Sequence, residues 1–86
     1  MKYYVYILES QKDGRFYIGQ SSNIKDRIER HNQNRSRATK FRGPWKIVYC
    51  EKFDSRNSAI IKEKYLKSLK NRKYLQDIIN RCGVEE

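Results

Sequence analysis

Residues 2–10 constrain the fold more than any other stretch, because they alternate with the period of a β-strand and are apolar or aromatic on both faces. One face carries Tyr4, Tyr6 and Leu8, and the other carries Tyr3, Val5 and Ile7. A strand with two such faces belongs in the interior of a sheet, so we place it at the centre of one. The stretch is too short and too tyrosine-rich for a signal peptide, which favours a cytoplasmic protein.

A turn signal follows this strand. Asp13-Gly14 is typical of a tight hairpin, so residues 15–19 are expected to return as the neighbouring strand. In that strand one face would carry Phe16 and Ile18, and the other would carry Tyr17 and Gly19. Tyr6 and Tyr17 would then lie on adjacent strands and could point to a common face.

The remaining elements follow from capping residues and periodicity. Ser21-Ser22-Asn23 offers capping side chains for a helix over 24–32. A polar loop over 33–44 and a strand over 45–53 are expected next. Asp54 or Ser55 caps a second helix that runs to about Lys70, and a third helix over 74–81 follows a basic break. One side of the third strand is expected to carry Trp45, Ile47, Tyr49 and Phe53.

The expected fold is therefore α/β. It contains a small three-stranded, mainly antiparallel sheet flanked by helices, in the order strand, strand, helix, strand, helix, helix. A chain of 86 residues has room for one hydrophobic core. We therefore expect a single domain over residues 1–82 and a short tail over residues 83–86.

The charge balance points to a polyanionic partner. Twenty Lys and Arg residues against ten Asp and Glu residues give a formal net charge of +10, and the basic residues alternate with aromatic ones. We expect a nucleic-acid partner, with DNA ahead of RNA. The loop would contact the phosphate backbone through Arg35, Arg37, Lys40 and Arg42. No apolar run approaches the roughly 20 residues that span a bilayer, so no membrane association is expected.

Glu63 stands out from the periodicity of the second predicted helix. It falls within the apolar arc formed by Ala59, Ile60 and Leu66. A carboxylate in that position costs free energy unless it is paired with a cation. Two explanations remain open, a partly buried salt bridge to a lysine or arginine and a ligand for a hard divalent ion.

Arg27 and His31 lie four residues apart, so they share one face of the first predicted helix. His31 could interact with the C-terminal dipole of that helix, or it could contact a substrate phosphate. For Tyr6 and Tyr17, packing is the alternative to catalysis. A phenol is a poor base at neutral pH because its unperturbed pKa is about 10. A catalytic phenol therefore needs positive charge nearby to favour the loss of its proton.

Several motifs in order along the chain carry a family resemblance. The first is Tyr4-Val5-Tyr6, and the second is Tyr17-Ile18-Gly19. The helix over 23–31 and the segments over 42–49 and 63–70 follow. From about Lys2 to Leu75 the chain resembles the GIY-YIG nuclease superfamily, and in particular its small stand-alone bacterial members. The resemblance implies a sheet with helices packed against it.

The resemblance also implies roles for individual residues. Tyr17 would be the base, Arg27 would hold the scissile phosphate, and Glu63 would bind Mg²⁺ or Mn²⁺. Tyr6 would also belong to the active site, and Tyr4 and Gly19 would be backbone positions of the two motifs. Independently of the resemblance, a nuclease could use His31 together with Tyr6 to position water or a phosphate oxygen.

Three functions are consistent with these features. The first is a metal-dependent endonuclease that hydrolyses phosphodiester bonds. The second is a nucleic-acid-binding module on the same scaffold, with little or no turnover. The third is a protein-interaction domain whose basic face meets an acidic partner. Glu63 separates the first two, because a metal enzyme needs a carboxylate that a phosphate-binding module does not. A nuclease this small is expected to need a partner protein for targeting.

Overall fold

The structure, a computed structural model, describes residues 2–33, 43–69 and 71–82. The elements are β1 (Tyr3–Ser10), β2 (Phe16–Ser21), α1 (Ile24–Asn32), β3 (Trp45–Phe53), α2 (Arg56–Ser68) and α3 (Arg72–Cys82). This order confirms the predicted α/β fold. The expected phosphate contacts Arg35, Arg37, Lys40 and Arg42 lie outside the described residues, as do Lys70 and the expected tail over 83–86.

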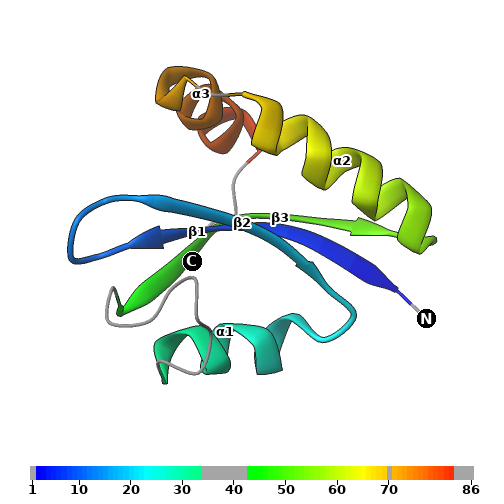
Figure 1. The fold of residues 1–86 in the computed structure, drawn as a ribbon, viewed down its shortest axis with the longest axis horizontal. Coiled ribbons are helices and arrows are strands. Elements are labelled where there is room, and N and C mark those ends of the chain that lie inside the picture. Colours follow the sequence, from blue (N-terminus) through cyan, green and yellow to red (C-terminus); the bar gives the residue numbers. More distant parts are fainter. Residues whose placement is uncertain (1, 34–42, 70, 83–86) are drawn as a thin grey trace.

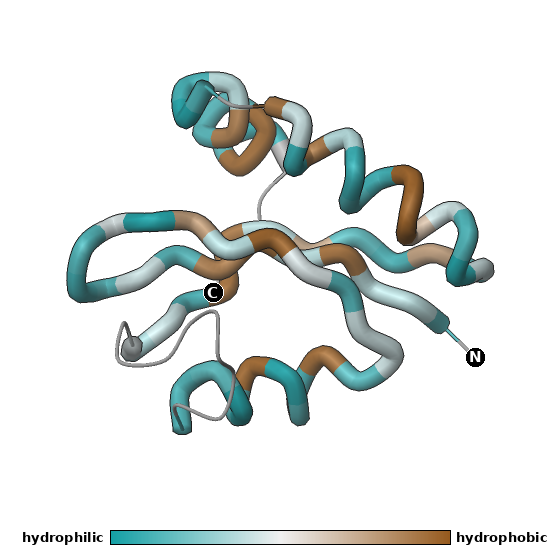
Figure 2. The backbone as a smooth tube through the Cα atoms, in the orientation of Figure 1, coloured by the Kyte–Doolittle hydropathy of each residue, from teal (hydrophilic) through white to brown (hydrophobic). Residues whose placement is uncertain are grey.

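Strand β1 lies at the centre of the sheet, as predicted, and both of its faces are covered. The sheet is antiparallel with the order β2-β1-β3. Helices α2 and α3 lie over one face, and α1 lies over the other (Figure 1). Val5, Ile7 and Leu8 are fully buried. Hydrophobic positions gather along the middle of the sheet and on the helix turns nearest to it (Figure 2).

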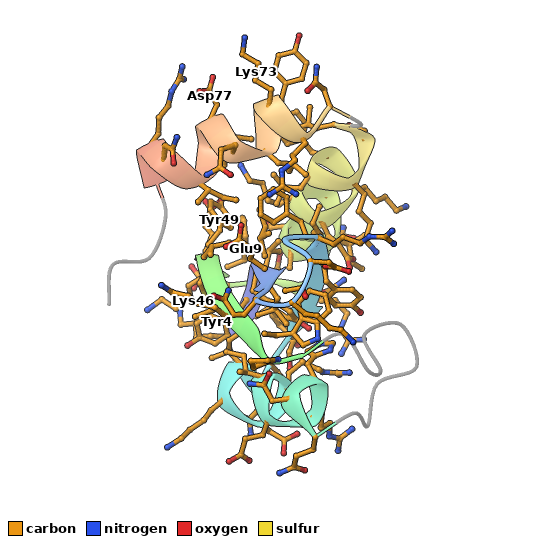
Figure 3. All side chains as sticks on the ribbon, turned by 90° about the vertical axis from the view of Figure 1, so that its left-hand side faces the viewer. Tyr4, Glu9, Lys46, Tyr49, Lys73 and Asp77 are labelled. Carbon is orange, nitrogen blue, oxygen red and sulfur yellow. The ribbon has the colours of Figure 1, made fainter. Side chains whose placement is uncertain are left out.

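Two separate cores result from this layering. The α2-side core contains Val5, Ile7, Tyr49, Ala59, Leu66 and Leu75. The α1-side core contains Tyr6, Leu8 and Trp45, with Tyr17, Ile24, Ile28 and Ile47 packed against it. In an edge-on view, Tyr49 lies between the sheet and α3, whereas Lys73 and Asp77 project outward from that helix (Figure 3). The side chains of β1 therefore divide between two different environments.

Strand β3 corrects one sequence prediction. That prediction placed four side chains on one side of the strand, namely Trp45, Ile47, Tyr49 and Phe53. The pairing of β3 with β1 shifts between Ile7 and Leu8, because Ile7 pairs with Tyr49 and Leu8 with Ile47. Val48 is thus an extra residue, and a bulge of this kind breaks the alternation. Trp45 and Ile47 pack in the α1-side core, whereas Tyr49 and Phe53 pack in the α2-side core.

Side-chain caps set the starts of the helices. The Asn23 side chain accepts a hydrogen bond from the backbone N–H of Asp26, which starts α1 where predicted. The Ser55 side chain does the same for α2. Helix α3 begins two residues earlier than predicted, at Arg72 instead of Tyr74. Its start follows Asn71, whose side-chain oxygen accepts a hydrogen bond from the backbone N–H of Lys73 at 2.8 Å.

The hairpin and the helices agree with two further expectations. Gly14 adopts a φ of 77° in the turn between β1 and β2, a conformation that glycine adopts without steric cost. Within the described residues, no helix is both long enough and apolar enough to cross a bilayer.

Replacing Leu66 with alanine tests the α2-side core. Leu66 is fully buried, whereas Ile61 on the same helix is 67% exposed. We expect Leu66→Ala to lower the free energy of unfolding by about 2–5 kcal/mol, since it removes apolar contacts and leaves a cavity. Ile61→Ala should change it by about 0.5 kcal/mol or less. Urea unfolding followed by circular dichroism measures both, and equal losses would contradict the assignment of Leu66 to the core.

Candidate active site

The candidate site starts from a close contact between two tyrosine rings and Gly19. Tyr6 on β1 pairs in register with Gly19 on β2, and Tyr17 lies two residues before Gly19 on the same face. A Cβ atom at position 19 would lie 2.7 Å from the hydroxyl oxygen of Tyr6 and 3.1 Å from the ring of Tyr17. Glycine is therefore needed here for space, because the two rings occupy the volume that a side chain would fill.

Helix α1 adds His31 to this pair. The imidazole is 1% exposed, and its Nε2 lies 3.2 Å from the hydroxyl oxygen of Tyr6. The ring centroid of His31 is 4.7 Å from that of Tyr17 and 6.1 Å from that of Tyr6. We call Tyr6, Tyr17 and His31 the ring cluster. Its histidine is buried and contacts both tyrosines.

Burial sets the protonation states of the Tyr6–His31 pair. The pKa of Tyr6 is raised by burial, and further by Tyr17 and Glu63, whereas the positive charge of Arg27 acts in the opposite direction. The pKa of His31 is lowered by burial and by the charge of Arg27. At neutral pH the phenol is thus protonated and the imidazole neutral. Such a pair forms one hydrogen bond, in which either group can donate. Tyr6 is accordingly a hydrogen-bonding group and not the base.

Tyr17 is the more accessible of the two tyrosines. Tyr6 is 1% exposed, whereas Tyr17 is half-buried at the edge of the α1-side core. Its ring also meets the indole of Trp45 edge-on, with 6.5 Å between centroids. Of the two phenols, Tyr17 is thus the one with surface that a substrate can reach.

Arg27 lies one helical turn before His31, and it lines a hollow at the end of β2. We call this the β2-end hollow. It has a volume of about 320 Å³ and is lined by Tyr3, Gln20, Ser21, Ser22, Arg27 and Arg56. The guanidinium of Arg27 is close enough to affect the pKa of both Tyr6 and His31. The predicted arginine therefore lies beside the ring cluster and faces a concave surface.

Glu63 approaches the same region from α2, on the opposite face of the sheet. Its carboxylate accepts a hydrogen bond of 3.0 Å from the side-chain amide of Gln20. Lys67, one turn further along α2, lies 3.2 Å away, and the Glu63 side chain is 17% exposed. The negative charge of Glu63 also contributes to the raised pKa of Tyr6. Its hydrogen bond to Gln20 connects Glu63 to β2, one residue after the motif glycine.

The two explanations left open for Glu63 remain compatible with this geometry. An ion pair with a lysine is present, but Lys67 is 57% exposed and the pair is an i,i+4 helix pair. Such pairs stabilise a protein by about 0.3–0.5 kcal/mol, so a metal could displace the lysine at little cost. Mg²⁺ commonly binds one or two carboxylates and completes its shell with water and substrate phosphate. The described residues contain no cluster of three metal-ligating side chains. They fit a metal held by one carboxylate, not an all-protein cage.

Four of the predicted site residues are in direct contact, and others lie near them. Direct contacts join Tyr6, Tyr17, Gly19 and His31. Arg27 and Glu63 act on Tyr6 through their charges. Tyr4 pairs with Ser21 and Lys52 in the sheet, which is consistent with a backbone position.

Sequence reasoning missed Gln20, Trp45 and Arg56 as neighbours of the site. Gln20 could have been found, since it follows Gly19 and must face the α2 side by strand alternation.

Two other hollows lie away from these residues. They have volumes of about 470 and 340 Å³, and both are lined by Tyr65, Ile78 and Arg81 on the α2–α3 side of the molecule. None of the predicted catalytic residues lines either hollow. Size alone therefore does not locate the candidate site.

Comparison with known proteins finds matches that cover most of this chain. The family model of the GIY-YIG catalytic domain matches residues 2–75. A UPF0213 protein of Clostridium perfringens is 39% identical over 84 residues, which cover 96% of this chain and 89% of the relative. One from Staphylococcus saprophyticus is 37% identical over 76 residues, covering 87% and 92%. The solution NMR structure of the UPF0213 protein BH0048 from Bacillus halodurans superposes with a TM-score of 0.58 at 35% identity, covering 91% and 83%.

Substitution of Gly19 by alanine tests the contact on which the site is built. The added Cβ would meet the Tyr6 ring below any normal contact distance, so the ring must move. We expect Gly19→Ala to lower the free energy of unfolding by about 1–3 kcal/mol, the usual cost of overpacking. Gly43→Ala is the control, because the nearest atom to its Cβ would be 3.5 Å away. Equal unfolding midpoints for Gly19→Ala and Gly43→Ala in urea would contradict this account.

His31 should make stability depend on pH. It is the single histidine of the chain. Its folded pKa lies below the unfolded value of about 6.5, so between these two values the unfolded chain binds more protons. Stability is therefore full above about pH 6.5 and falls as the pH is lowered through the folded pKa. Unfolding at pH 7.5, 6.5 and 5.5 should show this fall in the native protein and a smaller one in His31→Gln. Identical pH profiles would refute the assignment.

Proposed function

Because this chain belongs to the GIY-YIG catalytic domain family and its relatives are UPF0213 proteins, we propose that it is a metal-dependent endonuclease acting on nucleic acid, DNA ahead of RNA. The observation that best supports the proposal is that the ring cluster contacts Gly19 on β2, with Arg27 one helical turn from His31 and Glu63 hydrogen-bonded to Gln20 on the same strand. These groups come from two strands and from helices on opposite faces of the sheet, so their proximity is not a consequence of sequence neighbourhood.

Arg27 would bind the phosphate to be cleaved. A guanidinium presents paired N–H donors that match phosphate oxygens, and its charge favours the extra negative charge of the transition state. Glu63 would hold Mg²⁺ or Mn²⁺. When bound, such an ion stabilises the charge that develops on the leaving oxygen.

Tyr17 would accept the proton of the attacking water at its hydroxyl oxygen. A phenol becomes a base only after it has given up its own proton to solvent, so this role requires positive charge close to the hydroxyl. The neutral imidazole of His31 lies 4.7 Å from the Tyr17 ring, centroid to centroid, and packs against it. Tyr6, which is hydrogen-bonded to His31, would fix the positions of the His31 and Tyr17 rings.

The binding module without turnover remains the second candidate function. It is favoured by the ion pair between Glu63 and Lys67, because the lysine already compensates the negative charge of the carboxylate. Under this alternative, Glu63 would connect α2 to Gln20 on β2 and would take no part in chemistry.

Glu63→Gln separates the two candidates. The change keeps the shape of the side chain but removes the charge that a hard cation needs. We expect cleavage to fall by about 10²-fold or more, since metal stabilisation of the transition state is worth several kcal/mol. The melting temperature should change little, because the ion pair it removes is partly exposed. The assay uses supercoiled, branched and single-stranded DNA and an RNA arm, each with and without Mg²⁺ or Mn²⁺.

Glu51→Gln is the matched control. Glu51 is also half-buried and also pairs with a lysine of α2, Lys62, at 3.7 Å. It lies on β3, at the opposite edge of the sheet from Gln20. Its cleavage rate should equal that of the native protein. Unchanged cleavage in folded Glu63→Gln would end the metal-nuclease proposal and favour the binding module.

A further inference from the structure

The β2-end hollow has the chemistry of a phosphate site. Two arginines, two serines and a tyrosine contribute to its lining, and no carboxylate of the described residues does. Guanidinium groups and hydroxyls are hydrogen-bond donors, and arginine in particular binds phosphate through two parallel N–H bonds. The lining is therefore suited to an anion that accepts several hydrogen bonds.

The two arginines reach the hollow from opposite faces of the sheet. Arg27 belongs to α1, and Arg56 is the first residue of α2, directly after the capping Ser55. The hollow lies between them, where β2 ends at Ser21. The guanidinium carbon of Arg56 is 5.6 Å from the ring centroid of Tyr3, a cation–π contact that restrains the exposed side chain.

These two arginines differ from the others that the structure describes. Four arginines lie 3.2–3.9 Å from a carboxylate oxygen, namely Arg15, Arg30, Arg72 and Arg81. Among the described residues, Arg27 and Arg56 form no ion pair, and both line the same hollow. Their charges are thus uncompensated by neighbouring side chains. Two uncompensated guanidinium groups around one concave surface favour a bound anion.

We propose that Arg56 binds a backbone phosphate next to the one that is cleaved, so that the β2-end hollow holds the nucleic-acid strand on the flank of the site. The inference rests on the proposed function in one respect, since it takes Arg27 as the ligand of the scissile phosphate. Ser22 would donate a hydrogen bond to the flanking phosphate, whereas the Ser21 hydroxyl already donates to the backbone carbonyl of Asn23 at 3.1 Å. Arg56 then extends the site beyond the family motifs, onto the start of α2.

The salt dependence of DNA binding in metal-free buffer tests this inference. Loss of one phosphate contact should make the slope of log K against log[salt] less negative by about 0.9 on duplex DNA. We expect this change in Arg56→Gln, and we expect Arg56→Lys to retain the native slope because the charge remains. Lys12→Gln is the control, as Lys12 is exposed in the hairpin turn at the opposite end of β2. Fluorescence anisotropy between 50 and 200 mM salt, concentrations at which this effect is large, measures all four proteins.

Inorganic phosphate serves as a second probe. In ¹⁵N NMR titrations it should shift the backbone amides of Ser21 and Ser22 in the native protein and not in Arg56→Gln. An unchanged salt slope in Arg56→Gln overturns the inference even if phosphate binds. An equal slope change in Arg56→Gln and Lys12→Gln also overturns it, because the loss of any exposed positive charge would then produce the same effect. A lower melting temperature with a native slope would assign Arg56 to packing against Tyr3 and overturn it as well.

The test is independent of cleavage. Loss of cleavage in Glu63→Gln together with a native slope in Arg56→Gln would leave the nuclease proposal intact and remove only the flanking phosphate site. Native cleavage in Glu63→Gln together with a reduced slope in Arg56→Gln would remove the metal-nuclease proposal and leave a phosphate-binding hollow.

Discussion

The contact between the Tyr6 ring and the Cα of Gly19 is the constraint on which the rest of the site depends. A ring buried in the middle of a sheet needs space on the neighbouring strand, and the missing side chain at position 19 provides it. The Tyr6 hydroxyl then forms a hydrogen bond with His31, which lies on α1 at the same face of the sheet. Tyr17 packs against both rings and keeps one side accessible. The motif glycine thus acts through packing, since only Gly14 has a positive φ among the described glycines.

The two faces of the sheet contribute differently. The α2-side core is almost wholly apolar and gives the fold its stability. The α1-side core contains hydroxyls, an imidazole and an indole, so it combines packing with hydrogen bonding. Glu63 belongs to the first face, where it accepts a hydrogen bond from Gln20 on the edge strand β2. Groups from both faces can approach one another around such an edge strand.

Most of the fold follows from local sequence patterns. The two apolar faces of residues 2–10 predict the central strand, and Asn23 and Ser55 predict where α1 and α2 begin. The proximity of Tyr6 and Tyr17 also follows from hairpin alternation. The bulge at Val48 does not, because it depends on how β3 pairs with β1 and leaves no mark in the periodicity of β3 alone. Arg56 was not predicted for a similar reason, since it lines the hollow together with residues of other elements.

The bulge also has a consequence for how this chain can change in length. Trp45 packs in the α1-side core and Tyr49 in the α2-side core, and the bulge between them allows both placements. With Val48 deleted, Ile47 and Tyr49 would be neighbours in a regular strand and would still pair with Leu8 and Ile7, so Trp45 and Tyr49 would keep their cores. Loss of a second residue would place both aromatic rings on one face of a regular strand and send one of them to the wrong layer. The strand can therefore become one residue shorter without exchanging its two cores, but not two.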